Sequence, residues 1–237
     1  MNKRNGAVRM NLITLNQLLE IMPSAGKDRA ALFLSHINSA LIEFDIVTPA
    51  RQAAFLAQVA HESGSLRYVR EIADGSAYDR RAALGNTRPA AVKLAQEAGT
   101  TPGRRYRGRG LIQITGYDNY RACSTGLLGD PELLPKHPEM LEMPSLAVRS
   151  AAWFWDAHDL NALADRGDFE RITLIINGGL TKFAERLAFY ERAKRVLAKA
   201  EDAAGQVPFP QPTPQPQPQP QPEKLSWIHS LLRLFRR

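Results

Sequence analysis

The sequence has little of three things that stabilise or localise many proteins: cysteine, metal-ligand clusters and long apolar runs. Its single cysteine, Cys123, cannot form an intramolecular disulfide, and no Cys/His cluster has the spacing of a zinc site. No stretch is long enough to cross a bilayer, and the basic start, MNKRNGAVRMNLITLNQLLEIMP, lacks the continuous apolar segment of a signal peptide. We therefore expect a cytoplasmically made protein whose fold is held by packing alone, with no metal and no cofactor.

Length and composition favour one globular domain. The chain has 237 residues, of which 44% are hydrophobic and 23% charged, enough for one good core but cramped for two. Its formal net charge of +7 suggests an anionic partner, such as a cell envelope or a nucleic acid. Charge alone does not separate these two partners.

Helical periodicity dominates residues 12–205, which follow a short N-terminal extension at residues 1–11. The stretches TLNQLLEIM, DRAALFLSHINSALIEF, TPARQAAFLAQVAHESG, SLAVRSAAWFWDAHDL, DFERITLII and TKFAERLAFYERAKRVLAKA each place apolar residues three or four apart. Thr48 and Pro49 are suited to start the third stretch and Gly64 to end it, and Asp28 is expected to cap the second. We expect a mainly α fold.

Residues 72–110 lose this periodicity, and only PAAVKLAQEAG within them is typical of a helix. Glycines and prolines punctuate the rest, and the following LIQIT has the alternation of a short strand. Long irregular segments inside compact domains often carry function. The segment is therefore a place to look for site residues.

HESGSL, residues 61–66, places Glu62 where a helix is expected to end. Unpaired carbonyls and the negative end of the helix dipole disfavour a negative charge there, so this setting favours a carboxyl that keeps its proton. Such a carboxyl suits a general acid for glycoside cleavage. The alternative is a solvated glutamate at a frayed helix end.

Glu71 and Asp79 are the candidate partners of Glu62. At about 100° per residue, Glu71 would lie on the opposite face of one continuous helix, so cooperation requires the chain to break near Gly64 and turn back. Gly64 and Ser65 permit that break. Asp79 lies in a glycine-rich loop, where aspartates commonly cap turns.

Four arginines interleave with glycine and tyrosine in RRYRGRGLIQITGYDNY, residues 104–120. In isolation RGRG is compatible with an RNA-binding patch. It occurs once, however, and runs directly into apolar residues typical of a buried wall. We therefore expect no nucleic-acid partner.

These motifs together form a recognisable order. AQVAHESG, an acidic loop, YRGRGLIQITGYDNY, INGGL and ERLAFYERAKRVL resemble glycoside hydrolase family 19, the chitinase-like family that bacteriophage endolysins also use. The resemblance covers roughly residues 12–200 and implies a lysozyme-like, two-lobed helical domain with a central cleft. It also implies an inverting mechanism, which needs two carboxylates about 6.5 to 9.5 Å apart.

The resemblance also implies roles for individual residues. Glu62 matches the general acid, and Glu71 matches the base, with Asp79 as its rival because relatives often have Glu at that loop position. Thr115 matches the hydroxyl that holds the attacking water. Gln113, Asn119, Asn177 and Arg186 match groups that contact sugar or line the cleft. Thr181 stands where plant enzymes have an acidic residue, so their extended charge network is expected to be absent.

Aromatic side chains are further candidates for stacking on sugars. Tyr106 is counted here among the substrate-binding residues, and Tyr68 and Tyr78 are also available. Trp153 and Trp155 lie on an expected helix, where packing in the core is the better interpretation.

After Gly205 the composition changes abruptly. Residues 206–222 include VPFPQPTPQPQPQPQP, which predicts a semi-rigid polyproline spacer, and the stretch 208–222 within it could reach roughly 45 Å. Residues 223–237, EKLSWIHSLLRLFRR, predict a cationic amphipathic helix. Its expected membrane-binding residues are Lys224, Trp227, Ile228, Leu231, Leu232, Arg233, Phe235, Arg236 and Arg237. The alternative is a helix that docks on the catalytic domain or on a partner protein.

Together these features predict a monomeric endolysin that cleaves the β-1,4 glycan of peptidoglycan. Its second expected partner is an anionic membrane or lipopolysaccharide, bound through residues 223–237. Such a protein acts in the periplasm or on the cell wall after release from the host cytoplasm. The alternatives are a chitinase and a membrane-lytic or glycan-binding protein without hydrolase activity.

Overall fold

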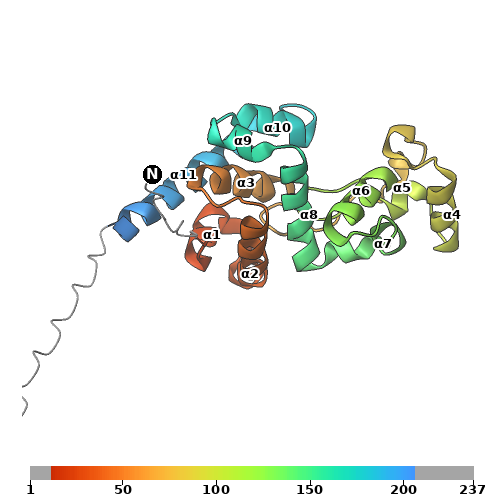
Figure 1. Cartoon of the computed structure of the whole chain (residues 1–237), viewed down its shortest axis with the longest axis horizontal. Coiled ribbons are helices and arrows are strands. Elements are labelled where there is room, and N and C mark those ends of the chain that lie inside the picture. Colours follow the sequence, from red (N-terminus) through yellow and green to blue (C-terminus); the bar gives the residue numbers. More distant parts are fainter. Residues whose placement is uncertain (1–11, 206–237) are drawn as a thin grey trace, which may run out of the picture. The chain divides into compact units, whose positions relative to one another are not determined.

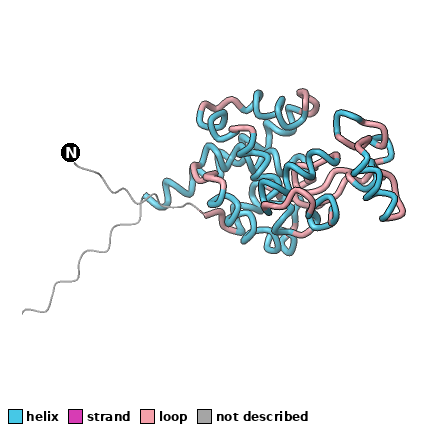
Figure 2. Tube along the Cα trace, turned by 45° about the vertical axis from the view of Figure 1, so that its right-hand side comes forward, coloured by secondary structure: helices cyan, strands magenta, loops and turns pink. Residues whose placement is uncertain are grey.

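The computed structural model describes residues 12–205, and helices make up most of this range (Figures 1 and 2). The α-helices are α1 (Leu15–Ile21), α2 (Lys27–Glu43), α3 (Pro49–Glu62), α4 (Pro89–Glu97), α5 (Pro102–Arg105), α6 (Tyr117–Leu128), α7 (Leu133–Lys136), α8 (Pro144–Ala157), α9 (Leu160–Asp165), α10 (Phe169–Asn177) and α11 (Phe183–Gly205). Four 3₁₀ turns join them: η1 (Pro23–Ala25), η2 (Ser76–Tyr78), η3 (Ala82–Leu84) and η4 (Pro138–Glu142). The prediction of a mainly α fold is confirmed, and no helix within residues 12–205 is long and apolar enough to span a membrane.

The chain divides into two units, Met1–Glu201 and Asp202–Arg237. The predicted N-terminal extension, the proline-rich spacer and the amphipathic helix at residues 223–237 all lie outside the described residues. Their predicted structures and the membrane-binding residues of that helix therefore stay predictions.

Local signals set the helix starts. The Thr14 hydroxyl accepts a hydrogen bond from the Gln17 backbone N–H and begins α1, and the Thr48 hydroxyl caps α3 in the same way. Pro49 occupies the first position of α3, where its missing N–H is not needed. The prediction for Asp28 is wrong, because α2 begins after Gly26 and Asp28 lies in its first turn.

LIQIT is not a strand, so that prediction is also wrong. Gly110 and Gln113 both have a positive φ, 81° and 60°, and turn the chain back on itself. Arg109 then forms isolated antiparallel bridges with Arg70 and with Ile114. The segment becomes a tight loop braced on both sides.

Two hydrophobic clusters make up the core of residues 12–199. The first takes side chains from α1, α2, α3 and α8 to α11, and includes Phe55 packed edge-on against Trp155 with ring centroids 5.5 Å apart. The second takes side chains from α4, α6, α7, η4 and the start of α8, and includes Tyr106 in edge contact with Tyr117 and Tyr120. In Figure 1, α8 stands between the two groups of helices, as the predicted two-lobed fold requires.

The chain breaks sharply after α3. Gly64, Ser65 and Leu66 all have left-handed backbone conformations, with φ of 57°, 60° and 66°. The Ser63 hydroxyl accepts a hydrogen bond from the Leu66 N–H, and Arg29 on α2 donates to the Leu66 carbonyl. The break predicted at Gly64 and Ser65 is confirmed, and it redirects the chain toward Glu71.

Candidate active site

Glu62 lies at the last position of α3, against a buried arginine from α11. Its Oε1 is 2.5 Å from Nη2 of Arg186, whose side chain is 2% exposed, whereas the Glu62 side chain is 18% exposed. The ion pair is not a hydrogen bond of regular geometry, and Oε1 is itself buried. Arg186 also donates to Asn177 at the end of α10, 3.3 Å away. The structure therefore brings together Glu62, Arg186 and Asn177, three residues that the sequence singled out separately.

Two buried polar residues complete this network and were missed by sequence reasoning. Arg186 Nη1 donates to Gln58 Oε1 at 2.6 Å, and Gln58 Nε2 donates to the Thr173 hydroxyl at 2.8 Å. Gln58 lies one helical turn before Glu62, and Thr173 lies one turn before Asn177. The available signal was a lone amide inside the apolar run AFLAQVA.

His61 forms a second link between α3 and α11. Its Nδ1 is 3.5 Å from the Glu185 carboxylate, next to the Glu62 and Arg186 pair. Burial lowers the pKa of His61, and the nearby Arg186 guanidinium lowers it further. Neutral imidazole is therefore favoured at neutral pH.

Glu71 is held by the RGRG loop. Its backbone N–H donates to the Gly108 carbonyl at 2.9 Å, and its Oε2 accepts a hydrogen bond from the Gly108 N–H at 3.2 Å. The Tyr78 hydroxyl donates to Glu71 Oε1 at 2.9 Å. Burial, together with this hydrogen bond, raises the pKa of Tyr78, so the hydroxyl keeps its proton for donation. The carboxylate is thus fixed between two donors.

Asp79, the rival of Glu71, has a different environment. Its Oδ1 accepts a hydrogen bond from the Gly103 N–H at 2.8 Å, at the start of α5. A Cβ on Gly103 would meet the Gly75 carbonyl at 2.3 Å, so the two loops pack in close backbone contact. Asp79 therefore joins the η2 loop to α5, which is the turn-holding role that its glycine-rich loop suggested.

Gly108 connects Glu71 to the polar residues of the following loop. A Cβ built on Gly108 would lie 2.6 Å from Gln113 Oε1 and 3.2 Å from Thr115 Oγ1. The Thr115 hydroxyl donates to the Gln113 carbonyl, and Asn119 donates to the Thr115 carbonyl at 2.7 Å. Gly108 thus contacts the Glu71 carboxylate through its N–H and the two side chains through its Cα. A side chain at this position would displace the Gln113 amide and crowd Thr115.

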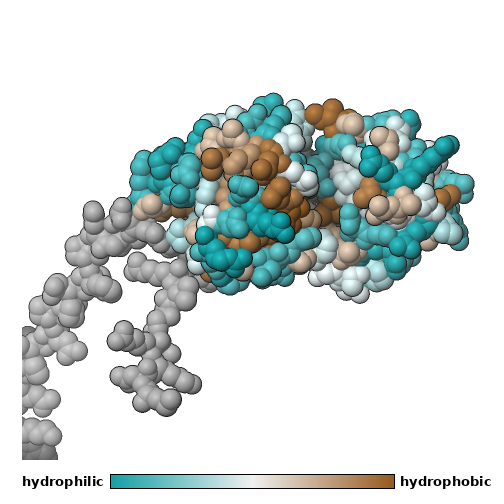
Figure 3. Space-filling model, turned by 90° about the horizontal axis from the view of Figure 1, so that it is seen from above, coloured by the Kyte–Doolittle hydropathy of each residue, from teal (hydrophilic) through white to brown (hydrophobic). Residues whose placement is uncertain are grey.

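A cavity of about 370 Å³ lies between the two groups of helices. One wall comprises Gln113, Thr115 and Asn119, and the other includes Trp153 and Phe154 of α8 and residues 175–176 of α10. In the space-filling view the surface is hollowed in this region, and apolar side chains gather mostly on the half formed by α1–α3 and α9–α11 (Figure 3). Neither Glu62 nor Glu71 lines the cavity. Residues 175–176 directly precede Asn177, which links the cavity to the Glu62 network.

Two of the aromatic candidates lie in the hydrophobic core, and a third lines the cavity. Tyr106 is 0% exposed and burial raises its pKa to about 12, so the prediction that it binds substrate is wrong: its ring fills the second hydrophobic cluster. Trp155 lies in the first cluster, as predicted. Trp153 is half-buried and lines the cavity, so core packing accounts for only part of its surface.

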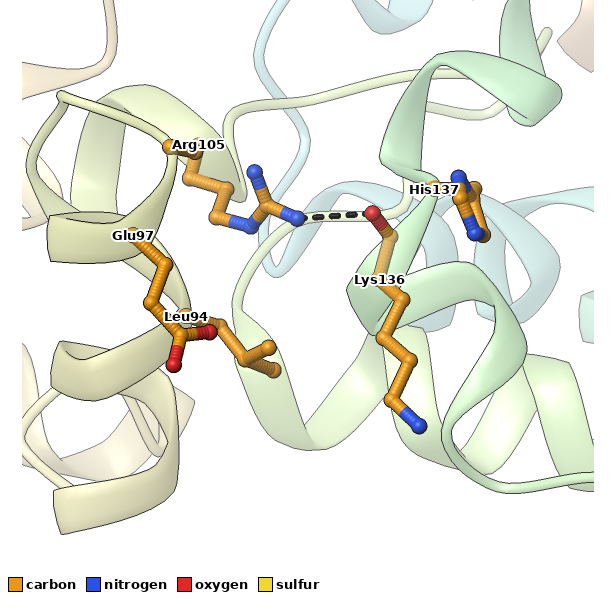
Figure 4. A pocket seen from close by; sticks show the side chains of 6 residues that line it. Leu94, Glu97, Arg105, Lys136 and His137 are labelled. Carbon is orange, nitrogen blue, oxygen red and sulfur yellow. Dashed lines mark hydrogen bonds between the residues drawn. The ribbon is translucent and has the colours of Figure 1, made fainter.

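A separate cavity of about 450 Å³ lies between α4, α5 and α7 (Figure 4). Its lining includes Leu94, Glu97 and Arg105, and Arg105 donates to the Lys136 carbonyl at 2.7 Å. None of the predicted site residues lines it. Its arginine is committed to backbone carbonyls, so we assign it no part in the site.

Two carboxylates, Glu62 and Glu71, are the candidate proton-transfer groups of this arrangement. One carboxylate projects from a helix end and the other from a loop, with a hydroxyl and two amides close to the second. Within residues 12–199, no group of three or more His, Cys, Asp and Glu side chains could hold a metal ion.

Comparison with known proteins gives a consistent result. A family model described as "Chitinase class I" matches residues 44–164. A protein of Haemophilus influenzae named "Glycosyl hydrolase family 19 domain-containing protein" is 33% identical over 175 residues, which covers 65% of this chain and 84% of that protein. Endochitinase At2g43610 of Arabidopsis thaliana is 40% identical over 128 residues, covering 54% of this chain and 39% of the relative. The chain thus spans most of the bacterial relative but about two fifths of the plant one.

Solved structures share the fold. Chitinase C from Streptomyces griseus HUT6037 superposes with a TM-score of 0.61 at 23% identity, covering 84% of this chain and 79% of that one. A structure described as a bacterial family 19 chitinase superposes with a TM-score of 0.57 at 25% identity, covering 79% of this chain and 95% of that one. The helical two-lobed architecture is common to all three.

Proposed function

The chain belongs to glycoside hydrolase family 19, and from this premise we propose that it is an endolysin that hydrolyses the β-1,4 glycan of bacterial peptidoglycan. The observation that carries the catalytic part is the pair of carboxylates on separate supports. Glu62 is held by buried Arg186 at a helix end, and Glu71 is held by Gly108 beside Thr115. This division of acid from base is what an inverting glycosidase needs.

In the proposed reaction, Glu62 protonates the oxygen of the leaving sugar as the glycosidic bond breaks. Arg186 occupies Oε1, so the other carboxyl oxygen, Oε2, is the one that carries the proton. Glu71 takes a proton from a water molecule that attacks the opposite face of the anomeric carbon, and the Thr115 hydroxyl orients that water. Gln113, Asn119 and Asn177 contact the sugar as hydrogen-bonding amides.

Peptidoglycan is favoured as substrate by the composition of the C-terminal segment. Residues 223–237 carry four basic and one acidic residue among tryptophan, leucine and phenylalanine, the composition of helices that enter anionic membranes. The polyproline sequence before them suits a spacer that keeps this segment away from the catalytic domain. A protein with this architecture is suited to reach murein through an envelope, and we propose the periplasm or cell wall as its place of action.

Chitin hydrolysis is the second candidate, and the similarity to plant endochitinases favours it. The two activities are separated by measuring reducing sugar released from purified murein and from chitin. Activity on murein supports the proposal, and activity on chitin alone contradicts it.

A binding or membrane-lytic protein without hydrolase activity is tested with Glu62→Gln. We expect this variant to release reducing sugar about 10³-fold more slowly, because a general acid typically contributes 10² to 10⁴-fold. Glu20→Gln, on the exposed side of α1, serves as control. Undiminished lysis of outer-membrane-stripped cells by Glu62→Gln would show that glycosidase chemistry is not the activity.

The role of residues 223–237 is tested separately by deleting residues 206–237. The truncated protein should cleave purified murein at the full rate but kill intact Gram-negative cells poorly. Unchanged killing would remove the permeabilising role and leave the hydrolase proposal standing.

A further inference from the structure

A second cavity of about 370 Å³ lies where the end of α3 meets the start of α11. It is distinct from the cavity that holds Gln113 and Thr115, and no residue lines both. The lining residues that bear on its chemistry are His61, Ser65, Arg67, Tyr68, Lys182 and Glu185. Nothing in the proposed reaction uses this cavity.

The cavity is lined by the residues next in sequence to Glu62 and Arg186, namely His61 and Glu185. Two neighbouring pairs join α3 to α11: Glu62 with Arg186 at 2.5 Å, and His61 with Glu185 at 3.5 Å. The first pair supplies the acid, and the second lines the cavity. A group bound in the cavity therefore contacts the residue that precedes Glu62 on α3 and the residue that precedes Arg186 on α11.

Two cations bring positive charge to this cavity without a partner. Neither Arg67 nor Lys182 forms an ion pair with any residue that the structure describes, and the one acidic group in the lining, Glu185, lies 3.5 Å from the neutral His61 ring. The Arg67 guanidinium lies 5.9 Å from the centre of the Tyr68 ring. Both side chains are exposed, and each can therefore contact a ligand.

The backbone at both cations is fixed. Lys182 has a φ of 56°, a left-handed conformation that a residue other than glycine seldom adopts, and such strain persists mainly where surrounding structure enforces it. Arg29 Nη2 donates to the Arg67 carbonyl at 2.6 Å. The Tyr68 ring packs on Gly64, where an added Cβ would lie 3.0 Å from the ring. The backbone positions from which the two cations project are therefore held in place.

We propose that this cavity binds the carboxylate-bearing peptide stem of murein, an inference that rests on the proposed murein hydrolysis. Peptide stems branch from alternate sugars of murein and carry carboxylates, whereas chitin carries neither stems nor carboxylates. Arg67 and Lys182 supply charge-assisted hydrogen bonds to such carboxylates, and Glu185 accepts from amide or amine groups. The cavity thus identifies the sugar that carries the stem and orients it beside Glu62.

The test compares one glycan in two forms: purified murein with its stems, and the same strands after an amidase has removed the stems. The double variant Arg67→Gln/Lys182→Gln is measured against Arg195→Gln/Lys199→Gln, which removes the same charge from exposed α11 residues that form no described ion pair. We expect kcat/KM of the first variant on stem-bearing murein to fall about tenfold or more, as for losing hydrogen bonds to charged groups. On stem-free strands it should match the wild type, and the control should match it on both.

Three outcomes would overturn the inference. An equal loss on both forms assigns the cavity to the sugar or to the fold, and no loss on either form removes its role in binding; in both cases the proposed function stands. If the wild-type protein cleaves neither form of murein, the proposed function fails and takes this inference with it.

Discussion

Glu62 and Glu71 are supported in contrasting ways. Glu62 ends a capped helix and is held by Arg186, which is itself held by Gln58 from inside the first hydrophobic cluster. Glu71 lies in an irregular segment and is held by one backbone N–H and one tyrosine hydroxyl. The helical support depends on a buried charge, and the loop support depends on close backbone packing. The two carboxylates should therefore fail in different ways when their supports are altered.

The largest effect on activity is expected when each of the two candidate bases, Glu71 and Asp79, is replaced separately by its amide. Glu71→Gln should lower kcat by about 10² to 10⁴-fold, because the amide cannot take a proton from water. Asp79→Asn should keep kcat and lower the free energy of unfolding by about 1 kcal/mol, through the weaker hydrogen bond to Gly103. Initial rates on purified murein and thermal unfolding check both. A large loss of kcat in Asp79→Asn with little loss in Glu71→Gln would instead identify Asp79 as the base.

Breaking the helical support should have the next largest effect. Arg186→Ala removes the buried partner of Glu62 and leaves Gln58 without its donor, so the free energy of unfolding should fall by about 3 kcal/mol and kcat should fall with it. Arg88→Ala removes an exposed ion pair with Asp118 and should leave both quantities unchanged. Urea unfolding measures the difference, and equal stability of the two variants would contradict the role of the buried charge.

Crowding the loop support should have a smaller effect on stability and a distinct effect on rate. An alanine at Gly108 would push Gln113 and Thr115 away from Glu71, lowering kcat by roughly tenfold to a hundredfold and stability by about 1 to 3 kcal/mol. Gly99→Ala, at a φ of 64° with open space around it, should lower stability by about 1 kcal/mol without changing kcat. An active Gly108→Ala would show that the close contact is not needed.

The smallest effect concerns pH. The pKa of His61 is lowered in the folded state, so as pH falls below about 6.5 the unfolded chain binds this proton first. The stability that depends on neutral His61 is therefore complete above that pH and is lost on acidification. His61→Gln should flatten the fall in melting temperature between pH 7 and 5, and an unchanged slope would exclude His61 as a contributor.

The position of Glu62 at a helix end could be predicted from the sequence, but the contacts that hold Glu71 in its loop could not. Thr48, Pro49 and the apolar period of α3 are local signals, and they located Glu62 at a helix end. The loop depends on contacts that no period encodes, such as Gly108 with Glu71, 37 residues apart. The burial of Tyr106 was missed for the same reason, because its ring contacts with Tyr117 and Tyr120 of α6 follow no local period in the sequence.

The left-handed turn at Gly64, Ser65 and Leu66 has a consequence for how this enzyme can vary. Residues 63–70 are the whole chain path between the two carboxylates, and Arg29 fastens the middle of that path to α2. The length of this segment therefore limits how far Glu62, the proposed acid, can lie from Glu71, the proposed base. Inserting or deleting one residue here would change the distance available to the water and the sugar without touching either carboxylate.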